Sequence, residues 1–585
     1  DSGTLTIDTG TSSAITGSGM DFTVGGAGNT SIDGFNIGAA SLTKDGAGTL
    51  FLTASDTFTG PINLNGGTLS FNSGTSRLGT GTLINYNGGA LLWNGISTDL
   101  SGRTNNFDAG GGTLIIDTGS VGVTSGTNFT GSGTLTKKGV GDLKFVDPLS
   151  SRTGDTVLQE GSITVDQDGQ FASTTGPLGT LYLDGGSFVQ SASGRSFANA
   201  HGNPVIVRSN SVITTISSST GTIDMYFTND IFTSQQGGSI TLSNGAGTGV
   251  LALRLYGQGF DFTGGITLRD DSGSGKGVGS LRSYNGSGAQ TFSGVLTGGG
   301  TYRRNSNPAG PGLAGNTVFS GDNTYSGGAT LVDGGLGFGI SSTGSPTVTS
   351  GPLGTGALAV SPGAGTLPAI FASGGARTIG NSINITGNFA PLIINGANNL
   401  TLSGPINLGG NTDTIQVDNS AATEFSGIIT NGGLTKTGSG TLKLSGADTY
   451  AGNTTISNGT LALGAGGSLP NTLTITLAGG TTFDVSASSF ALGGSQTIYN
   501  NGTNAATITG SLDLSASASK AKFEATGGGS PAAGKLVVSG VLTLNGNILT
   551  VNVSGAPLTL GTNLRLMDAK SSALSSVAIT RPVNL

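Results

Sequence analysis

The fold is decided by a stretch that occurs twice, as Gly433–Leu463, GLTKTGSGTLKLSGADTYAGNTTISNGTLAL, and as Ser41–Phe71, SLTKDGAGTLFLTASDTFTGPINLNGGTLSF. The two copies align without a gap. Both begin with Leu-Thr-Lys, continue through alternating apolar residues and reach an Asp-Thr-aromatic corner before another glycine. Such close internal similarity indicates that one structural unit is used more than once along the chain.

Two weaker copies lie between them. Leu135-Thr136-Lys137 leads to GSITVD from Gly161, and Phe319–Leu331, FSGDNTYSGGATL, keeps the corner as Asn-Thr-Tyr. The third copy lacks Leu-Thr-Lys, and we interpret TYRRNSNPAGPG from Thr301 as a loop inserted there. The order of the flanking segments predicts five consecutive parts of a solenoid: 1–100, 101–200, a divergent 201–370 with loop insertions, 371–510 and the final coils 511–585.

The residues that define the repeat are leucines, corner aromatics, glycines and one lysine in each complete copy. We expect the aromatic residues to pack at one corner and the lysines to face solvent at another. These repeat positions are Leu42, Lys44, Phe58, Gly60, Leu135, Lys137, Tyr325, Gly327, Leu434, Lys436, Tyr450 and Gly452.

Short runs such as TLKL, TTIS and TLAL alternate apolar and polar residues and end at Asn-Gly or Ser-Gly. A period of two with turn residues predicts strands, and the 109 glycines supply many tight turns. Only LMDAKSSAL from Leu566 is compatible with a short helix. Sandwiches and barrels also use short strands, but the repeats favour an all-β fold: a single long parallel β-helix (β-solenoid) without significant helix, with about 20 to 24 residues per coil.

The composition excludes several classes of protein. Charged residues make up 9% of the chain, against about 25% in an ordinary soluble domain. The net charge is −7 and the sequence contains no run of basic residues, which argues against nucleic-acid binding. The absence of cysteine excludes disulfides and thiolate metal sites. No stretch of about 18 apolar residues is present, so the sequence predicts no membrane-spanning helix.

The string from Leu434 to Leu461 resembles the autotransporter-associated β-strand repeat, also called the passenger-associated transport repeat. The resemblance is specific at 41–71 and 433–463 and weaker at Leu135 and Phe319. It implies a right-handed parallel β-helix that is exported to the bacterial cell surface as a passenger, and it does not imply an enzyme. We therefore expect an extracellular, non-enzymatic protein without a cofactor.

LTIDTG from Leu5 and LIIDTG from Leu114 each contain Asp-Thr-Gly, the form in which an aspartic protease presents its catalytic carboxylate. Such an enzyme needs two carboxylates that share a proton. Asp8 and Asp117 instead occupy a turn position that holds Asn in TISNG from Thr455. We expect five stacking steps of a solenoid, about 24 Å, to separate them. The sequence therefore predicts two turns and no protease.

Metal and nucleotide motifs are incomplete. GGAGNTSID from Gly25 approaches a calcium-binding solenoid turn, but Thr30 stands where Asp is needed. His201 is the only histidine, which leaves no ligand set for zinc. In Leu-Thr-Lys-x-Gly-x-Gly the lysine precedes the glycines, unlike in a phosphate-binding loop. Trp93, the only tryptophan, is either a core or a groove residue.

The densest cluster of charge lies in the most divergent part of the chain. Its composition suggests a glycan-binding patch, a catalytic site for polysaccharide cleavage or merely a solvated irregular segment. The residues are Arg254, Arg269, Asp270, Asp271, Lys276, Arg282, Arg303 and Arg304.

Both ends of the sequence continue the strand pattern, at Gly3–Gly10 and in LVVSGVLTLNGNILTVNVSG from Leu536. Uncapped solenoid ends predict head-to-tail self-association. The first functional hypothesis is therefore a structural rod that polymerises into a surface fibre with itself as partner. The alternatives are a monomeric adhesin that binds glycans or surfaces, and a polysaccharide-cleaving enzyme.

Overall fold

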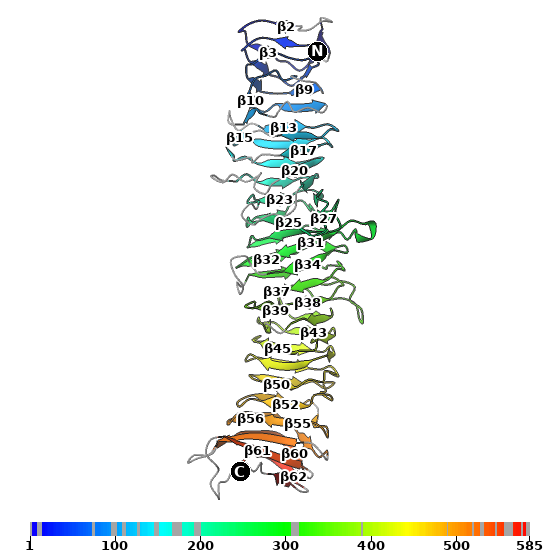
Figure 1. Cartoon of the computed structure of the whole chain (residues 1–585), viewed down its shortest axis with the longest axis vertical. Coiled ribbons are helices and arrows are strands. Elements are labelled where there is room, and N and C mark those ends of the chain that lie inside the picture. The colour runs from blue at the N-terminus through cyan, green and yellow to red at the C-terminus, as the bar shows by residue number, and fades with distance from the viewer. Residues whose placement is uncertain are drawn as a thin grey trace. The chain divides into compact units, whose positions relative to one another are not determined.

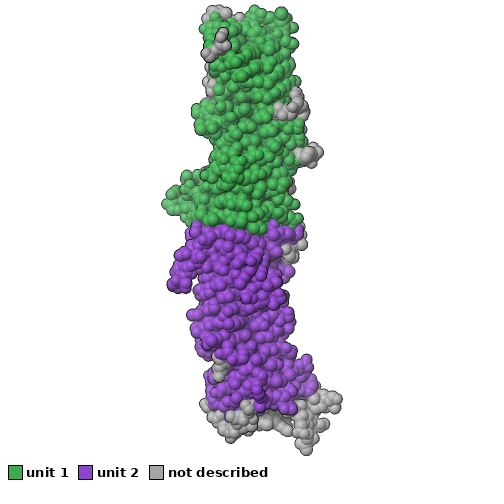
Figure 2. Space-filling model, turned by 180° about the vertical axis from the view of Figure 1, so that it is seen from behind, with its two compact units in different colours: residues 1–285, 290–301 green, residues 286–289, 302–585 purple. Residues whose placement is uncertain are grey.

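The computed structural model describes residues 3–8, 15–72, 77–94, 102–107, 113–125, 129–145, 151–165, 178–191, 201–305, 315–387, 390–487, 490–516, 520–526, 532–544, 547–554, 565–574 and 577–580. These residues form short strands joined by turns (Figure 1). The one helical element among them is a 3-10 turn at Ser272–Ser274. The chain divides into unit 1, residues 1–285 and 290–301, and unit 2, residues 286–289 and 302–585 (Figure 2).

Unit 1 contains three long sheets, in each of which hydrogen bonds join the strands in the following order. The first consists of β1 (Thr4–Ile7), β4 (Asn29–Ile32), β7 (Thr49–Leu52), β9 (Thr68–Asn72), β11 (Ala90–Asn94), β13 (Thr113–Asp117), β16 (Thr134–Lys138), β19 (Thr156–Leu158), β21 (Leu181–Leu183), β23 (Val205–Val207) and β26 (Phe232–Ser234). The second consists of β18 (Ser151–Arg152), β15 (Phe129–Gly131), β12 (Thr104–Asn106), β10 (Leu83–Tyr86), β8 (Ile62–Leu64), β6 (Leu42–Lys44) and β3 (Phe22–Val24). The third consists of β14 (Val123–Ser125), β17 (Asp142–Phe145), β20 (Ser162–Val165), β22 (Ser187–Gln190), β24 (Ser211–Thr215), β27 (Ile240–Asn244), β30 (Ile266–Leu268) and β33 (Leu296–Thr297).

Shorter groups of paired strands complete unit 1. They are β2 (Ile15–Thr16) with β5 (Phe35–Asn36), β25 (Thr222–Phe227) with β28 (Val250–Leu255) and β31 (Val278–Ser283), and β29 (Phe260–Phe262) with β32 (Ala289–Phe292).

Unit 2 also contains three sheets. The first consists of β34 (Thr301–Arg304), β36 (Ala329–Leu331), β38 (Leu358–Val360), β41 (Ile383–Ile385), β44 (Ile406–Asn407) and β47 (Ile429–Thr430). The second consists of β35 (Asn316–Phe319), β37 (Gly334–Phe338), β39 (Pro368–Ala372), β42 (Leu392–Ile394), β45 (Thr412–Val417), β48 (Gly433–Thr437), β50 (Thr454–Ile456), β52 (Thr474–Leu477), β55 (Thr497–Asn500), β58 (Lys520–Thr526), β61 (Asn547–Ser554) and β63 (Val577–Thr580), with β59 (Ala532–Ala533) beside β58. The third consists of β40 (Arg377–Ile379), β43 (Leu400–Leu402), β46 (Thr423–Phe425), β49 (Thr441–Leu444), β51 (Thr460–Leu463), β53 (Thr482–Asp484), β56 (Ala505–Thr509), β60 (Lys535–Leu544), β57 (Leu512–Leu514) and β54 (Phe490–Ala491), with β62 (Met567–Leu574) beside β60.

The strands within each unit form the coils of a parallel β-solenoid, as predicted. Leu50 of β7 pairs in parallel with Leu69 of β9, which pairs with Leu91 of β11. All three leucines are fully buried. Because side chains alternate across a strand, one set of apolar residues stacks inside the coils while Thr, Ser and Asn face outward. Burial of these columns is the main stabilising term of each coil.

Coil length varies more than the sequence indicated. The paired residues Thr43 and Asn63 are 20 residues apart, whereas Thr267 and Thr297 are 30 apart. The longer coils carry excursions such as the one between β30 and β31. The five sequence-defined parts do not coincide with the two compact units, so their boundaries stay a prediction, as does the right-handed sense of the coils.

Two segments are strands where the sequence allowed another structure. Met567–Leu574 of LMDAKSSAL, the segment compatible with a short helix, forms strand β62, which pairs with β60, because tertiary pairing overrides a weak local preference for helix. The first four residues of the predicted insertion, Thr301–Arg304, form strand β34, paired with β36, and residues 306–312 of that insertion lie outside the described residues. Its Tyr-Arg-Arg therefore stands where the other copies have Leu-Thr-Lys.

Candidate functional site

The predicted charged residues lie on three strands and on one surface loop. Arg254 and Arg282 lie side by side in register on β28 and β31 of unit 1. Arg303 and Arg304 lie on β34 in unit 2, and the Arg304 side chain is buried. Arg304 is therefore not available to a ligand at the surface.

The other four predicted residues belong to the excursion between β30 and β31. An antiparallel bridge joins Asp270 to Val278 and closes this excursion. Within it, the guanidinium of Arg269 pairs with Asp271 at 2.8 Å, and Lys276 is exposed. The arrangement is a charged loop at the surface, with no pair of carboxylates set across a cleft.

Arg254 is the centre of a group that we call the tyrosine–arginine strip: Asp224, Tyr226, Arg254, Tyr256, Arg282 and Tyr284 on and just after β25, β28 and β31. The Nε of Arg254 donates to Asp224 Oδ1 at 2.6 Å. Its guanidinium carbon lies 5.1 Å from the ring centroid of Tyr226 and 5.0 Å from that of Tyr284. Burial, the largest single effect, lowers the pKa of Arg254, but the bond to Asp224 together with the charges of Asp224, Tyr226 and Tyr284 outweighs it and raises the pKa.

The tyrosines of this strip were not predicted from the sequence, although a signal was present. LRLY at Leu253–Tyr256 returns as LRSY at Leu281–Tyr284. In a solenoid, such a return at the length of one coil predicts that like residues stack on each other.

Each complete repeat contains a second feature, a buried lysine cradled by carbonyl oxygens. The Nζ of Lys436 donates to Thr437 O at 2.8 Å, Gly438 O at 2.9 Å and Asn458 O at 3.1 Å. Thr437 and Gly438 form the corner of its own coil, and Asn458 belongs to the next coil. We call this arrangement the cation cradle.

The cradle recurs in the other copies with the same geometry. Lys44 donates to the carbonyl oxygens of Asp45 and Gly46 and, less closely, of Gly66 in the next coil. Lys137 donates to Lys138 O at 2.8 Å and Gly139 O at 2.7 Å, and to the next coil through Glu160 O at 3.2 Å. The prediction of solvent-facing lysines is therefore wrong.

The three lysines are at most 1% exposed, because inward-pointing carbonyl oxygens at the corner need a donor. Burial lowers the pKa of Lys137 and of Lys436 to about 8, and shifts the pKa of Lys44 in the same direction. Nearby carboxylates oppose this shift because they favour the protonated amine; they are Asp142, Asp117 and Glu160 for Lys137, Asp418 for Lys436 and Asp45 for Lys44.

Arg304 takes the lysine's place in the third copy. Its guanidinium donates to Asn305 O at 2.7 Å and to Gly315 O at 2.6 Å. The longer side chain reaches a carbonyl just before β35, which a lysine does not contact in the other copies. The sequence did not reveal this equivalence, because Arg replaces Lys and extra residues follow it.

The remaining repeat positions are structural. Phe58, Tyr325 and Tyr450 are all buried at the corner, and Leu42, Leu135 and Leu434 are buried on inward faces. At Gly60 a Cβ would lie 1.9 Å from Ala40 O, and at Gly452 it would lie 2.4 Å from Gly432 O, so coils approach closely there. Gly327 is exposed.

The corner also buries a carboxyl group. Asp448 is 1% exposed, and its Oδ1 accepts the backbone N–H of Ile429 at 2.8 Å while Oδ2 has no hydrogen-bond partner among the residues that the structure describes. Burial raises the pKa of Asp448 to about 7. Asn323 occupies the same position in the third copy and donates to Pro352 O at 2.8 Å.

Asp8 and Asp117 lie on or after strands β1 and β13, which are five steps apart in their sheet, as predicted. Five steps correspond to about 24 Å. Asp117 Oδ1 accepts the backbone N–H of Gly119 at 2.9 Å, as expected of a turn residue. The two carboxylates cannot share a proton, so no aspartic-protease site forms here.

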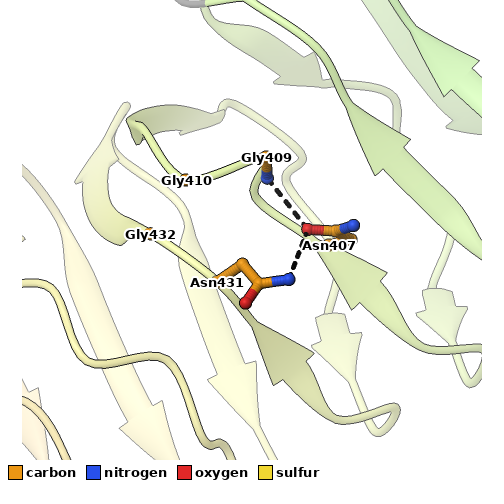
Figure 3. Close-up of a pocket in the computed structure, with 5 residues that line it drawn as sticks. All are labelled: Asn407, Gly409, Gly410, Asn431 and Gly432. Carbon is orange, nitrogen blue, oxygen red and sulfur yellow. Dashed lines mark hydrogen bonds between the residues drawn. The ribbon is translucent and has the colours of Figure 1, made fainter.

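Hollows on the surface are shallow. One in unit 2 is lined by Asn407, Gly409, Gly410, Asn431 and Gly432, and Figure 3 shows Gly409 N and Asn431 Nδ2 both donating to Asn407 Oδ1, at 2.9 and 3.2 Å. These amides satisfy each other and leave no charged group in the hollow. A second hollow runs from Asp418 to Ala462 past the ion pair of Glu424 and Lys443.

Metal ligands do not gather in the described ranges: no three His, Cys, Asp or Glu side chains lie close enough together to hold an ion. Across the same ranges, no helix is long and apolar enough to cross a membrane. The side chain of Trp93 falls outside the described residues.

Comparison with known proteins supports the repeat assignment. Residues 42–71, 314–336 and 434–463 match the family described as Passenger-associated-transport-repeat. The copy at Leu135 lies outside these segments. The adhesin BmaC autotransporter of Brucella suis biovar 1 (strain 1330) is 33% identical over 178 residues, which are 30% of this chain and 4% of that protein. No solved structure matches.

The fold and the matched segments define the class. The chain is a parallel β-solenoid that carries passenger-associated transport repeats, and it is an extracellular protein of the cell surface. It spans only a small part of the length of the relative that it matches.

Proposed function

We propose that this chain is a non-enzymatic, adhesin-like passenger segment, a β-solenoid whose outer surface makes contacts outside the cell. The observation that carries the proposal is the position of the matched repeats. Residues 42–71 and 434–463 each form stacked coils. Their apolar side chains are buried inside the coils, and the residues that face outward are mostly polar. The adhesin name of the relative adds support.

Surface display tests this function. The chain is fused to an unrelated outer-membrane anchor in a non-adherent bacterium, and attachment to glycan-coated and uncoated surfaces is counted. Cells displaying an unrelated β-solenoid of similar length serve as the control. We expect more attachment with this chain, and equal attachment would contradict the proposal.

The absence of enzymatic activity is part of this proposal. In the charged cluster, Arg269 and Asp271 neutralise each other on an exposed loop, which offers no general acid and base across a cleft. The purified chain is incubated with a panel of polysaccharides, and the release of reducing ends or unsaturated sugars is measured. Activity that Arg269→Ala or Asp271→Ala abolishes would contradict the proposal.

Head-to-tail association into a fibre is a second proposed function. It is favoured by the sparse charge of the chain, with 9% charged residues and a net charge of −7, because weak repulsion permits close contact between copies. Negative-stain microscopy of the purified chain tests it: continuous filaments support the proposal, and isolated particles at high concentration contradict it.

A further inference from the structure

The tyrosine–arginine strip lies on three consecutive coils of unit 1. Tyr226, Arg254 and Arg282 are in register on β25, β28 and β31. Tyr256 and Tyr284 follow β28 and β31 directly. A ligand that runs along the strip would therefore meet like groups at each coil, about 4.8 Å apart.

The aromatic rings of the strip form a stack. The centroids of Tyr226 and Tyr256 are 5.9 Å apart, and those of Tyr256 and Tyr284 are 4.9 Å apart, with interplanar angles of 21° and 26°. Tyr226 and Tyr284 are buried, whereas Tyr256 is half-exposed. Tyr256 is the middle ring, with Tyr226 on one side and Tyr284 on the other, so the part of it that reaches solvent is its edge.

Arg254 is committed to this stack. It is bonded to Asp224 and lies against two of the rings. A carboxylate and two aromatic rings stabilise the charge of its guanidinium. Arg254 therefore holds the residues of the strip in place and has little hydrogen-bonding capacity left for a ligand.

Arg282 differs from its neighbour. It is half-exposed, and its one described contact is a long hydrogen bond of 3.5 Å from Nε to Ser280 Oγ. No carboxylate in the described part of the chain pairs with it. Of the two adjacent arginines, Arg254 alone has an aspartate partner, so the positive charge of Arg282 is uncompensated in a protein of net charge −7.

We propose that the strip binds an acidic polysaccharide through Arg282 and Tyr256, an inference that rests on the proposed surface function. The planar guanidinium of Arg282 matches the two oxygens of a sugar carboxylate or sulfate. The ring of Tyr256 is half-exposed and has a tyrosine on each face, so its edge is the part that can contact the pyranose. Uronic acids and sulfated sugars share this chemistry.

A nucleic acid fits the strip less well. Nucleic-acid binding depends on many phosphate contacts, commonly about six to ten, whereas this strip offers one arginine without an acidic partner. Single-stranded DNA therefore serves as the comparison ligand in the test.

Binding of the purified chain to immobilised polymers tests the inference, with polygalacturonate for the carboxylate, heparin for the sulfate and dextran as the neutral polymer. We expect binding to at least one acidic polymer at low salt, weakening as salt rises. Dextran should not bind, and single-stranded DNA should bind more weakly than the acidic polymer.

Variants locate the site. Arg282→Ala should weaken acidic-polymer binding about tenfold or more, Arg282→Lys should weaken it less, and Tyr256→Ala should weaken it without changing the slope against salt. Arg208→Ala is the matched control, because Arg208 is half-exposed and lies 3.5 Å over the Tyr182 ring in the same unit. Circular dichroism checks that each variant is folded.

Three results would overturn the inference: no binding to either acidic polymer, an equal loss with Arg208→Ala, or tighter binding to DNA. The two proposals fail separately. If displayed chain confers attachment but purified chain binds neither acidic polymer, the inference about the strip is wrong and the proposed surface function is unaffected. Displayed chain that confers no attachment would contradict the surface function instead.

Discussion

The Nζ of Lys436 lies 3.1 Å from the carbonyl oxygen of Asn458, one coil further along the solenoid. The same amine bonds two carbonyl oxygens of its own corner. A single buried charge therefore ties adjacent coils together at a corner, where the ladder of strand hydrogen bonds is interrupted. Lys44 and Lys137 repeat the arrangement, and Arg304 fills the same corner through carbonyl oxygens of its own coil, so the cradle belongs to the repeat and not to one coil.

The first prediction concerns this cradle. Lys436→Met keeps much of the apolar stem but leaves three carbonyl oxygens without their donor, so we expect the free energy of local unfolding to fall by about 3 kcal/mol. Hydrogen exchange of amides in residues 433–463 measures this. Lys436→Arg should cost less, because Arg304 fills a cradle naturally. Lys443→Ala is the control, since Lys443 is 46% exposed; an equal loss there would refute the role of the cradle.

The second prediction concerns the glycine that covers the cradle. Gly459 has φ of 68°, and a Cβ there would lie 2.6 Å from Gly438 O and 2.7 Å from Gly440 O. Gly480 has φ of 85°, but a Cβ there would meet no atom within 4 Å. Gly480→Ala should therefore cost about 1 kcal/mol from backbone strain alone, and Gly459→Ala clearly more. Equal costs by hydrogen exchange would show that coil contact adds nothing.

The third prediction concerns pH. The pKa of Asp448 is raised from 3.8 to about 7 by burial, so between these values the folded state holds a proton that the unfolded state releases. Its contribution to stability is complete below about pH 4 and is lost as the pH rises through about 7, by roughly 4 kcal/mol at most.

Asp448→Asn should remove this dependence, because Asn323 fills the same corner with a neutral amide. The difference in local opening free energy between the variant and the natural chain, measured by hydrogen exchange from about pH 4 to about pH 8, should grow in favour of the variant. A difference that is constant with pH would contradict the shifted pKa.

The fourth prediction concerns the corner hydroxyl. Tyr450 OH lies 2.7 Å from Thr454 Oγ1, which also lies 3.0 Å from Thr472 Oγ1. Tyr450→Phe leaves Thr454 with a partner, and Phe58 fills the equivalent corner naturally. The loss of stability should therefore stay near about 1 kcal/mol, whereas Tyr450→Ala should cost about 4 kcal/mol. Thermal unfolding followed by circular dichroism distinguishes the two outcomes.

The fold could be predicted from the sequence because strand alternation and the close repeats both point to stacked parallel coils. Lys44 also follows the alternation that buries Leu42, but a general preference for exposed lysine suggested a solvent-facing side chain. Only the structure shows that corner carbonyl oxygens point inward and require a cation. The role of Arg304 could not be predicted, because this copy has arginine in place of lysine and a longer corner after it than the other copies.

The candidate site was only partly predictable. The sequence identified Arg254 and Arg282 within a cluster, but the length of each divergent coil decides which residues stack, and coil length could not be derived from composition. The register of β25, β28 and β31 brings the two arginines together with three tyrosines. The same register leaves Arg269 and Asp271 on a separate loop.

The stacking of coils is tested most directly by distances between spin labels, which the cysteine-free chain accepts at chosen sites. Thr401, Glu424, Lys443, Ala462, Asp484 and Thr509 are successive partners across six strands of unit 2. The backbone distance should be about 14 Å for Thr401→Cys with Ala462→Cys, three steps apart, and about 24 Å for Thr401→Cys with Thr509→Cys, five steps apart. A difference of about 10 Å between the two narrow distributions is the predicted result. Distances that are broad, or that do not grow with the number of coils, would contradict the solenoid.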